Sequence, residues 1–92
     1  MKKMDNKTWQ VYIIQSESGK LYTGITTDID RRFQEHKNKK GAKYFRFEKP
    51  ENIVFLEDHE NRSKATKREI EIKKLSRKGK FKLIETFETG LT

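Results

Sequence analysis

Arg32 and His36 stand four residues apart in a stretch whose spacing predicts a helix. Ile29 and Phe33 have the same spacing and mark the buried stripe of that helix, and Arg32 and His36 fall on this stripe. Core-facing rows normally carry apolar side chains, so an anion-binding guanidinium and a titratable imidazole indicate a functional site. The structural alternative is that Arg32 extends around the edge of the core and His36 is a hydrogen-bonded interior histidine.

Glu69 holds a comparable position on a second predicted helix. Ala65, Ile72 and Leu75 define the apolar face of this helix, and Glu69 lies on the shoulder of that face. The structural alternative is a surface carboxylate that pairs with Lys73 at i+4.

Two tyrosines occupy a predicted hairpin. If even-numbered residues of one strand pair with even-numbered residues of the other, Tyr12 and Tyr22 emerge on the same face. Gly24 would then leave space there for a phosphate to approach closely. The simpler alternative is that strands are rich in tyrosine.

Positive charge dominates the composition. The formal net charge is +8 over 92 residues, with 39% charged and 32% hydrophobic residues, which favours polyanionic partners. Nucleic acid is the first such partner and an anionic membrane surface the second. Residues 36–47 mix basic and aromatic side chains, which can contact phosphates and stack on bases. The residues expected to bind nucleic acid are Gly24, Arg31, Lys37, Lys39, Lys40, Lys43 and Arg46.

The chain reads as one small cytoplasmic domain. It has no cysteine, which excludes disulfides and thiolate metal sites, and no signal peptide or membrane-spanning run is visible. We expect an N-terminal tail over residues 1–8, a domain over 9–86 and a C-terminal tail over 87–92.

Local patterns predict an α+β fold in the order ββαβαα, a small central three-stranded antiparallel sheet flanked by helices. Asp28 is the expected N-cap of the first helix, and Asn61 or Ser63 that of the second. The third strand is expected to be central in the sheet. Strands are predicted over 9–15, 21–26 and 52–58, and helices over 28–37, 61–75 and 78–86.

These residues together resemble the GIY-YIG nuclease domain. The matching positions are Val11-Tyr12, Tyr22-Thr23-Gly24, the run from Asp28 to Phe33, His36 and Arg68-Glu69. The resemblance covers residues 9–84 and is nearest to a subgroup of free-standing bacterial single-domain proteins. These are similar to the nuclease part of eukaryotic endonucleases that cut branched DNA.

The resemblance implies a metal-dependent DNA endonuclease. Tyr12 and Tyr22 match the two motif tyrosines. Arg32 matches the arginine that contacts the scissile phosphate, His36 the histidine one turn later, and Glu69 the single metal-binding carboxylate. The implied cofactor is one Mg²⁺ or Mn²⁺ ion, and the implied partner is DNA in preference to RNA, with a protein scaffold as a further partner and no membrane. Tyr12 would be the general base, with its pKa lowered by neighbouring positive charge.

The chain also departs from the family pattern. Gln10, Val11 and Thr23 replace motif residues but keep strand character. Many members carry a late Asn, whereas this chain has none after Leu75. A non-catalytic nucleic-acid-binding module with the same fold is therefore the alternative to an endonuclease, and an adaptor that binds other proteins is a third hypothesis.

Overall fold

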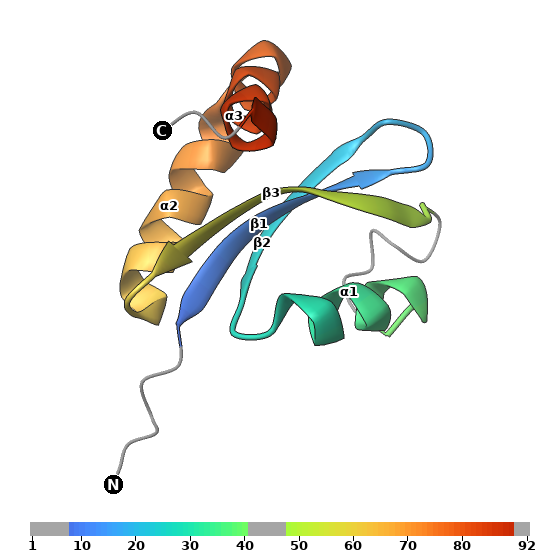
Figure 1. Ribbon diagram of the computed structural model, residues 1–92, viewed down its shortest axis with the longest axis horizontal. Helices are drawn as coiled ribbons and strands as arrows, with labels where there is room; N and C mark the ends of the chain where they lie inside the picture. The colour runs from blue at the N-terminus through green and yellow to red at the C-terminus, as the bar shows by residue number, and fades with distance from the viewer. Residues whose placement is uncertain (1–7, 41–47, 90–92) are drawn as a thin grey trace, which may run out of the picture.

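The computed structural model describes residues 8–40 and 48–89 (Figure 1). Three strands and three helices follow one another in the predicted order ββαβαα. The elements are β1 (Trp9–Ser16), β2 (Leu21–Thr26), α1 (Ile29–Lys37), β3 (Pro50–His59), α2 (Arg62–Lys74) and α3 (Arg77–Thr89). In the described part of the chain, no helix is long and apolar enough to cross a bilayer.

The sheet is antiparallel and has the strand order β2-β1-β3, so the predicted fold class is confirmed. The expectation that the third strand is central was wrong, because β1 occupies the centre and β3 an edge. Residues Val11 to Ile14 are all buried, as expected for a strand covered on both faces. β3 begins at Pro50, and a proline that cannot donate to a ladder suits the start of an edge strand.

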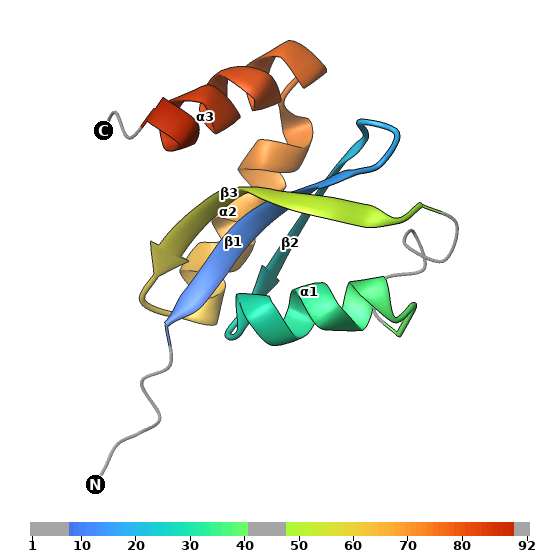
Figure 2. The same ribbon diagram turned by 45° about the vertical axis from the view of Figure 1, so that its right-hand side comes forward.

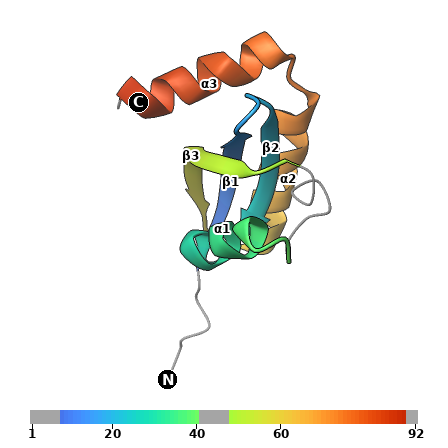
Figure 3. The same cartoon turned by 90° about the vertical axis from the view of Figure 1, so that its right-hand side faces the viewer.

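Helices cover both faces of the sheet, which divides the core in two. On one face, Val11 and Ile13 pack with Ala65 and Ile72 of α2 and Ile84 of α3. On the other face, the neighbouring positions of β1 pack with Ile29 and Phe33 of α1. Figures 2 and 3 show α1 on one side of the strands and the α2–α3 pair on the other.

Side chains at the helix starts fix where the chain turns. Asp28 Oδ1 accepts a hydrogen bond from the Arg31 amide at 3.1 Å, and Asn61 Oδ1 accepts one from the Lys64 amide at 2.9 Å. Asp28 and Asn61 are therefore the N-caps of α1 and α2, and the prediction for Asp28 is confirmed. Ser76 Oγ accepts from the Gly79 amide at 3.1 Å at the start of α3.

The end of α2 differs from the prediction. Leu75 was expected on the buried face, but it is the C-cap with a ψ of 149°, and its residue is 39% exposed. The extended ψ ends the helix at this residue, so no further turn of α2 follows to cover its side chain. Ala65 and Ile72 alone are the buried residues of α2 among those the structure describes.

Candidate active site at the β2 edge

Tyr12 lies at the centre of the candidate site. It is buried on β1, directly opposite Gly24 of the edge strand β2. A Cβ atom on Gly24 would lie 2.5 Å from the Tyr12 hydroxyl oxygen and 2.7 Å from Cζ, so the tyrosine ring crosses the glycine. The space expected at Gly24 for a phosphate is therefore occupied by the Tyr12 ring. The hydroxyl reaches the β2 edge because Gly24 has no side chain.

Tyr22 and His36 complete an aromatic cluster around Tyr12. Ile14 pairs with Tyr22 as Tyr12 pairs with Gly24, which confirms the predicted even-to-even register. The Tyr22 and His36 ring centroids lie 5.6 Å apart in an edge-on arrangement, and the Tyr12 and Tyr22 centroids lie 6.4 Å apart. His36 is fully buried, and its Nε2 lies 3.0 Å from the Tyr12 hydroxyl.

Burial moves the pKa of both partners of this hydrogen bond away from neutral pH. Desolvation raises the pKa of Tyr12 to about 12, while the Arg32 side chain acts in the opposite direction by a smaller amount. The prediction that positive charge lowers the pKa of Tyr12 below its usual value was therefore wrong. Desolvation, helped by the charge of Arg32, lowers the pKa of His36 to about 4. At neutral pH the free protein holds a protonated Tyr12 and a neutral His36.

Arg32 lies between Tyr12 and an acid that the sequence reading missed. Its Nη1 donates to Glu35 Oε1 at 2.9 Å, and its side chain also hydrogen bonds to Tyr12. The Arg32 side chain is 33% exposed, so it joins the buried cluster to solvent. The i,i+3 spacing of Arg32 and Glu35 is a signal that could have identified this ion pair.

Glu69 approaches Tyr12 from the opposite face of the sheet. Its side chain is 18% exposed, and its carboxylate pairs with Lys73 Nζ at 3.1 Å, the i,i+4 pair that the structural alternative predicted. Its charge also acts on Tyr12, where it contributes to the raised pKa. Tyr12, Tyr22, Arg32 and His36 therefore come together at the β2 edge, and the charge of Glu69 on α2 acts on Tyr12.

Glu69 is the carboxylate at the candidate site that could hold a metal ion. Within residues 8–40 and 48–89, no three His, Asp or Glu side chains are close enough together to enclose an ion. The donor set at Glu69 fits a hard cation that keeps several waters and takes its other ligands from a substrate phosphate.

Arg68 anchors the helix that carries Glu69. Its Nε donates to Glu57 Oε1 on β3 at 2.9 Å, its Nη2 to Oε2 at 3.4 Å, and its Nη1 to Glu71 at 3.2 Å. Arg68 and Glu69 lie on either side of the buried stripe that runs from Ala65 to Ile72. Because Arg68 is tied to β3, α2 is held with Glu69 turned towards the β2 edge.

The expected phosphate-binding residues of α1 and its end are exposed. They are Arg31, Lys37, Lys39 and Lys40, while Lys43 and Arg46 lie outside the described residues. The amides of Lys39 and Lys40 donate to the carbonyls of His36 and Glu35 at 3.1 and 2.8 Å, which closes α1. Lys39 has a φ of 63°, a left-handed conformation in which glycine is usual.

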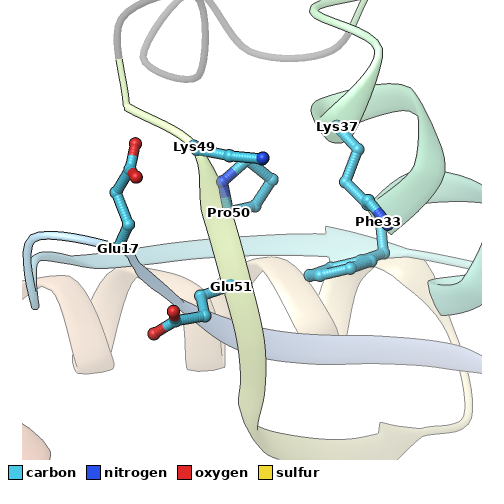
Figure 4. A pocket seen from close by; sticks show the side chains of 6 residues that line it. All are labelled: Glu17, Phe33, Lys37, Lys49, Pro50 and Glu51. Atoms are coloured by element: carbon cyan, nitrogen blue, oxygen red, sulfur yellow. The ribbon is translucent and has the colours of Figure 1, made fainter.

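A pocket of about 300 Å³ lies elsewhere on the surface, between the β1–β2 turn, α1 and the start of β3 (Figure 4). It is lined by Glu17, Phe33, Lys37, Lys49, Pro50 and Glu51. None of the five clustered residues lines it. This pocket is therefore separate from the clustered residues.

Comparison with known proteins identifies the family of this chain. The family model described as the GIY-YIG catalytic domain matches residues 8–83. A UPF0213 protein of Desulfotalea psychrophila is 46% identical over 89 residues, which cover 96% of this chain and 81% of the relative. A UPF0213 protein of Staphylococcus saprophyticus is 45% identical over 74 residues, covering 80% and 90% of the two chains.

A solved structure supports the fold as well. The solution NMR structure of a UPF0213 protein from Bacillus halodurans is 40% identical in sequence and has a TM-score of 0.55. The match covers 85% of this chain and 83% of that one. The chain belongs to the GIY-YIG catalytic domain family, a family of nuclease domains, and its relatives within that family are UPF0213 proteins.

Proposed function

We propose that this protein is a divalent-metal-dependent endonuclease that hydrolyses phosphodiester bonds in DNA, branched intermediates included, in the cytoplasm. The observation that carries the proposal is the convergence of one guanidinium, one carboxylate, one imidazole and two phenols at the β2 edge. Phosphodiester hydrolysis needs a proton acceptor for the attacking water and positive charge at the phosphate and leaving oxygen.

Arg32 is the phosphate-binding group in this proposal. Its planar fork can hold two phosphate oxygens and stabilise the charge that develops on them during attack. Glu35 binds Nη1 and fixes how the guanidinium is presented. Tyr22 and His36 orient the Tyr12 hydroxyl and the water, because their rings pack directly beside it.

Glu69 is the residue that would hold Mg²⁺ or Mn²⁺. A bound ion of this kind supplies positive charge at the phosphate and at the leaving oxygen. Lys73 would then have to release the carboxylate that it now pairs with.

Tyr12 is the proposed general base. The water oxygen bonds to phosphorus, its proton passes to the ionised Tyr12 oxygen, and the bond from phosphorus to the leaving oxygen breaks. In the free protein this oxygen is protonated, because burial raises the pKa of Tyr12 to about 12 and the charge of Glu69 contributes. A cation beside Glu69 would offset that carboxylate charge and bring the pKa of Tyr12 down.

The same raised pKa favours the second candidate, a non-catalytic nucleic-acid-binding module. A hydroxyl that stays protonated at neutral pH cannot accept a proton from water. Both candidates bind DNA, and they differ in whether a cation makes the site cleave it.

Glu69→Gln separates the two functions, with Glu71→Gln as the matched control. Both glutamates lie on α2, but Glu71 is exposed and pairs only with Arg68 among the described ion pairs. Wild type and Glu71→Gln should cleave branched or linear DNA with Mg²⁺ or Mn²⁺, and EDTA should abolish the cleavage. Glu69→Gln should bind DNA as well as wild type or better, without cutting it. DNA binding by wild type without cleavage under every metal condition would select the binding module.

Manganese provides a readout that does not depend on cleavage. In an NMR titration, Mn²⁺ should broaden resonances near Glu69, Tyr12 and Arg32 in wild type and much less in Glu69→Gln. Broadening confined to surface carboxylates such as Glu57 and Asp58 would mean that Glu69 does not hold an ion.

Substrate class and partners follow from the charge. With a net charge of +8, the protein should bind DNA through phosphate contacts, and matched DNA and RNA duplexes test our preference for DNA. A protein scaffold is a further proposed partner, which co-purification from cells would identify.

A further inference from the structure

Residues 73–82, named here the α2–α3 corner, carry a second concentration of positive charge away from α1. Six of these ten residues are basic and none is acidic. The corner includes the last turn of α2, the C-cap Leu75 and the first turn of α3. Its basic residues are Lys73, Lys74, Arg77, Lys78, Lys80 and Lys82, all exposed except the half-buried Lys80.

The structure fixes this corner relative to the candidate site. Arg77 Nη2 donates to the Gly19 carbonyl at 2.9 Å, which holds the start of α3 against the β1–β2 turn (Figure 3). Lys73 pairs with Glu69 at 3.1 Å, so the basic surface begins at the proposed metal-binding carboxylate. At 1.5 Å per residue, Lys74 lies roughly 7–8 Å along α2 from Glu69. That distance is about two base-pair rises along the axis of duplex DNA.

The dipole of α2 favours Lys73 and Lys74 in its last turn, but helix stability does not explain the charge of α3. The first turn of α3 contains no acidic residue, and cations there oppose the positive end of the helix dipole. Lys78 and Lys82 are one turn apart on an exposed stripe of α3, where no described carboxylate pairs with either of them. Cations that oppose the helix dipole on a solvent-facing surface indicate that this surface binds an anionic partner.

We infer that the α2–α3 corner is a second phosphate-backbone-binding surface, which holds the nucleic acid beyond the phosphate at Arg32. The inference rests on the proposed function for its partner. Nucleic acid fits better than an anionic membrane, because the large apolar residues of α3 have partners within the molecule, although Phe81 and Phe87 are 36% and 43% exposed. The Arg77 guanidinium lies over the Phe81 ring, 4.8 Å from its centroid. Ile84 is in the core, and the Phe87 ring packs on Phe55 at 5.8 Å. A helix that lies on a membrane needs such residues to enter the lipid.

Lys78→Gln/Lys82→Gln tests the corner, and Lys64→Gln/Lys67→Gln is the matched control. Each variant removes two exposed lysines from a helix, but Lys64 and Lys67 lie near the other end of α2. Binding of the full chain to a DNA duplex is measured by fluorescence anisotropy in EDTA at several salt concentrations, so no cleavage is required. Losing two phosphate contacts should make the slope of log K against log salt concentration shallower by about 1.8. It should weaken binding on the order of 10- to 60-fold at 0.1 M salt.

The control should keep the wild-type slope and nearly the wild-type affinity. If DNA binding weakens equally in both variants, or in neither, the inference that the α2–α3 corner binds phosphates is wrong. The endonuclease proposal would still stand. Absence of DNA binding by wild type would overturn both proposals. Vesicles containing phosphatidylserine complete the test, since loss of vesicle binding without loss of DNA binding in Lys78→Gln/Lys82→Gln assigns the corner to a membrane instead.

Discussion

The Tyr12 hydroxyl and His36 Nε2 share one buried hydrogen bond of 3.0 Å, and burial acts on the two groups in opposite directions. The pKa of the tyrosine rises to about 12 and that of the histidine falls to about 4. Burial disfavours the charged form of either group, so the pair is neutral across the physiological range. Among the described residues, the charges that act on this pair belong to Arg32, Glu35 and Glu69.

Acid should destabilise the fold through His36. The pKa of His36 falls from 6.5 to about 4 on folding, so between these values the unfolded chain binds the extra proton. Stability is therefore complete above pH 6.5 and decreases as the pH falls towards 4. Between pH 7 and pH 5 the free energy of unfolding should drop by about 2 kcal/mol, measured by urea unfolding. His36→Gln should remove most of this drop and His59→Gln should retain it. An equal drop in both variants would assign it to other groups.

Cleavage should speed up with alkaline pH. The value of kcat/KM reports groups of the free enzyme, in which the pKa of Tyr12 is about 12. If Tyr12 must lose its proton before it acts, kcat/KM should rise about tenfold per pH unit between pH 7 and 9, without a plateau. Tyr12→Phe should remove the activity. Activity that remains in Tyr12→Phe, with a plateau near pH 8, would mean that another group is the base.

Local sequence rules gave the helix starts and the strand register. Asp28 was predictable because a side-chain acceptor before an apolar-periodic run caps a helix. The shared face of Tyr12 and Tyr22 followed from the alternation of side chains along paired strands. The stripe carrying Arg32 and His36 was visible because it broke helical periodicity. These features depend on neighbours in sequence or on one hairpin.

Features that depend on distant contacts were not predictable. The central position of β1 is decided by which strands pair on its two sides, and the apolar run of β3 is equally compatible with either place. The pKa of Tyr12 depends on how far α1 and α2 exclude water, so charge near it in sequence indicated the wrong direction. Leu75 was misplaced because sequence locates a helix end only to within one or two residues, and α2 ends at this residue.

Arg32 and its neighbour Arg31 should respond differently to substitution. Arg32 hydrogen bonds to Tyr12 and Glu35, whereas Arg31 is exposed. Arg32→Ala should abolish cleavage with a modest loss of stability, and Arg31→Ala should retain most activity. Cleavage rates with saturating DNA and thermal unfolding provide the comparison. Similar cleavage rates for the two variants would mean that Arg32 does not bind the phosphate.

Replacement of Lys39 by glycine should stabilise the fold and weaken DNA binding. Its left-handed backbone, with a φ of 63°, disfavours any residue with a Cβ atom. Lys39→Gly should therefore raise the free energy of unfolding by about 0.5–1 kcal/mol. It should also weaken DNA binding by removing one phosphate contact. Lys40→Gly removes an equal charge without relieving a positive φ. If Lys40→Gly also stabilises the protein, the gain in Lys39→Gly does not come from backbone strain at Lys39.

Gly24 and Gly79 provide a matched pair of alanine substitutions for the candidate site. At Gly24 a new Cβ would meet Tyr12 atoms at 2.5 and 2.7 Å, and the buried ring cannot rotate away without losing its contact with His36. Gly24→Ala should cost about 1–3 kcal/mol and displace the hydroxyl, so cleavage should fall further than the folded fraction does.

At Gly79 the nearest atom is Leu75 Cβ at 3.4 Å, an ordinary contact. Gly79→Ala should stabilise α3 by up to about 1 kcal/mol and leave cleavage unchanged. Urea unfolding and cleavage assays on both variants measure these effects, and ¹³C shifts of the Tyr12 ring report whether it has moved. Full activity in Gly24→Ala would mean that the close approach of Tyr12 to β2 has no part in the chemistry.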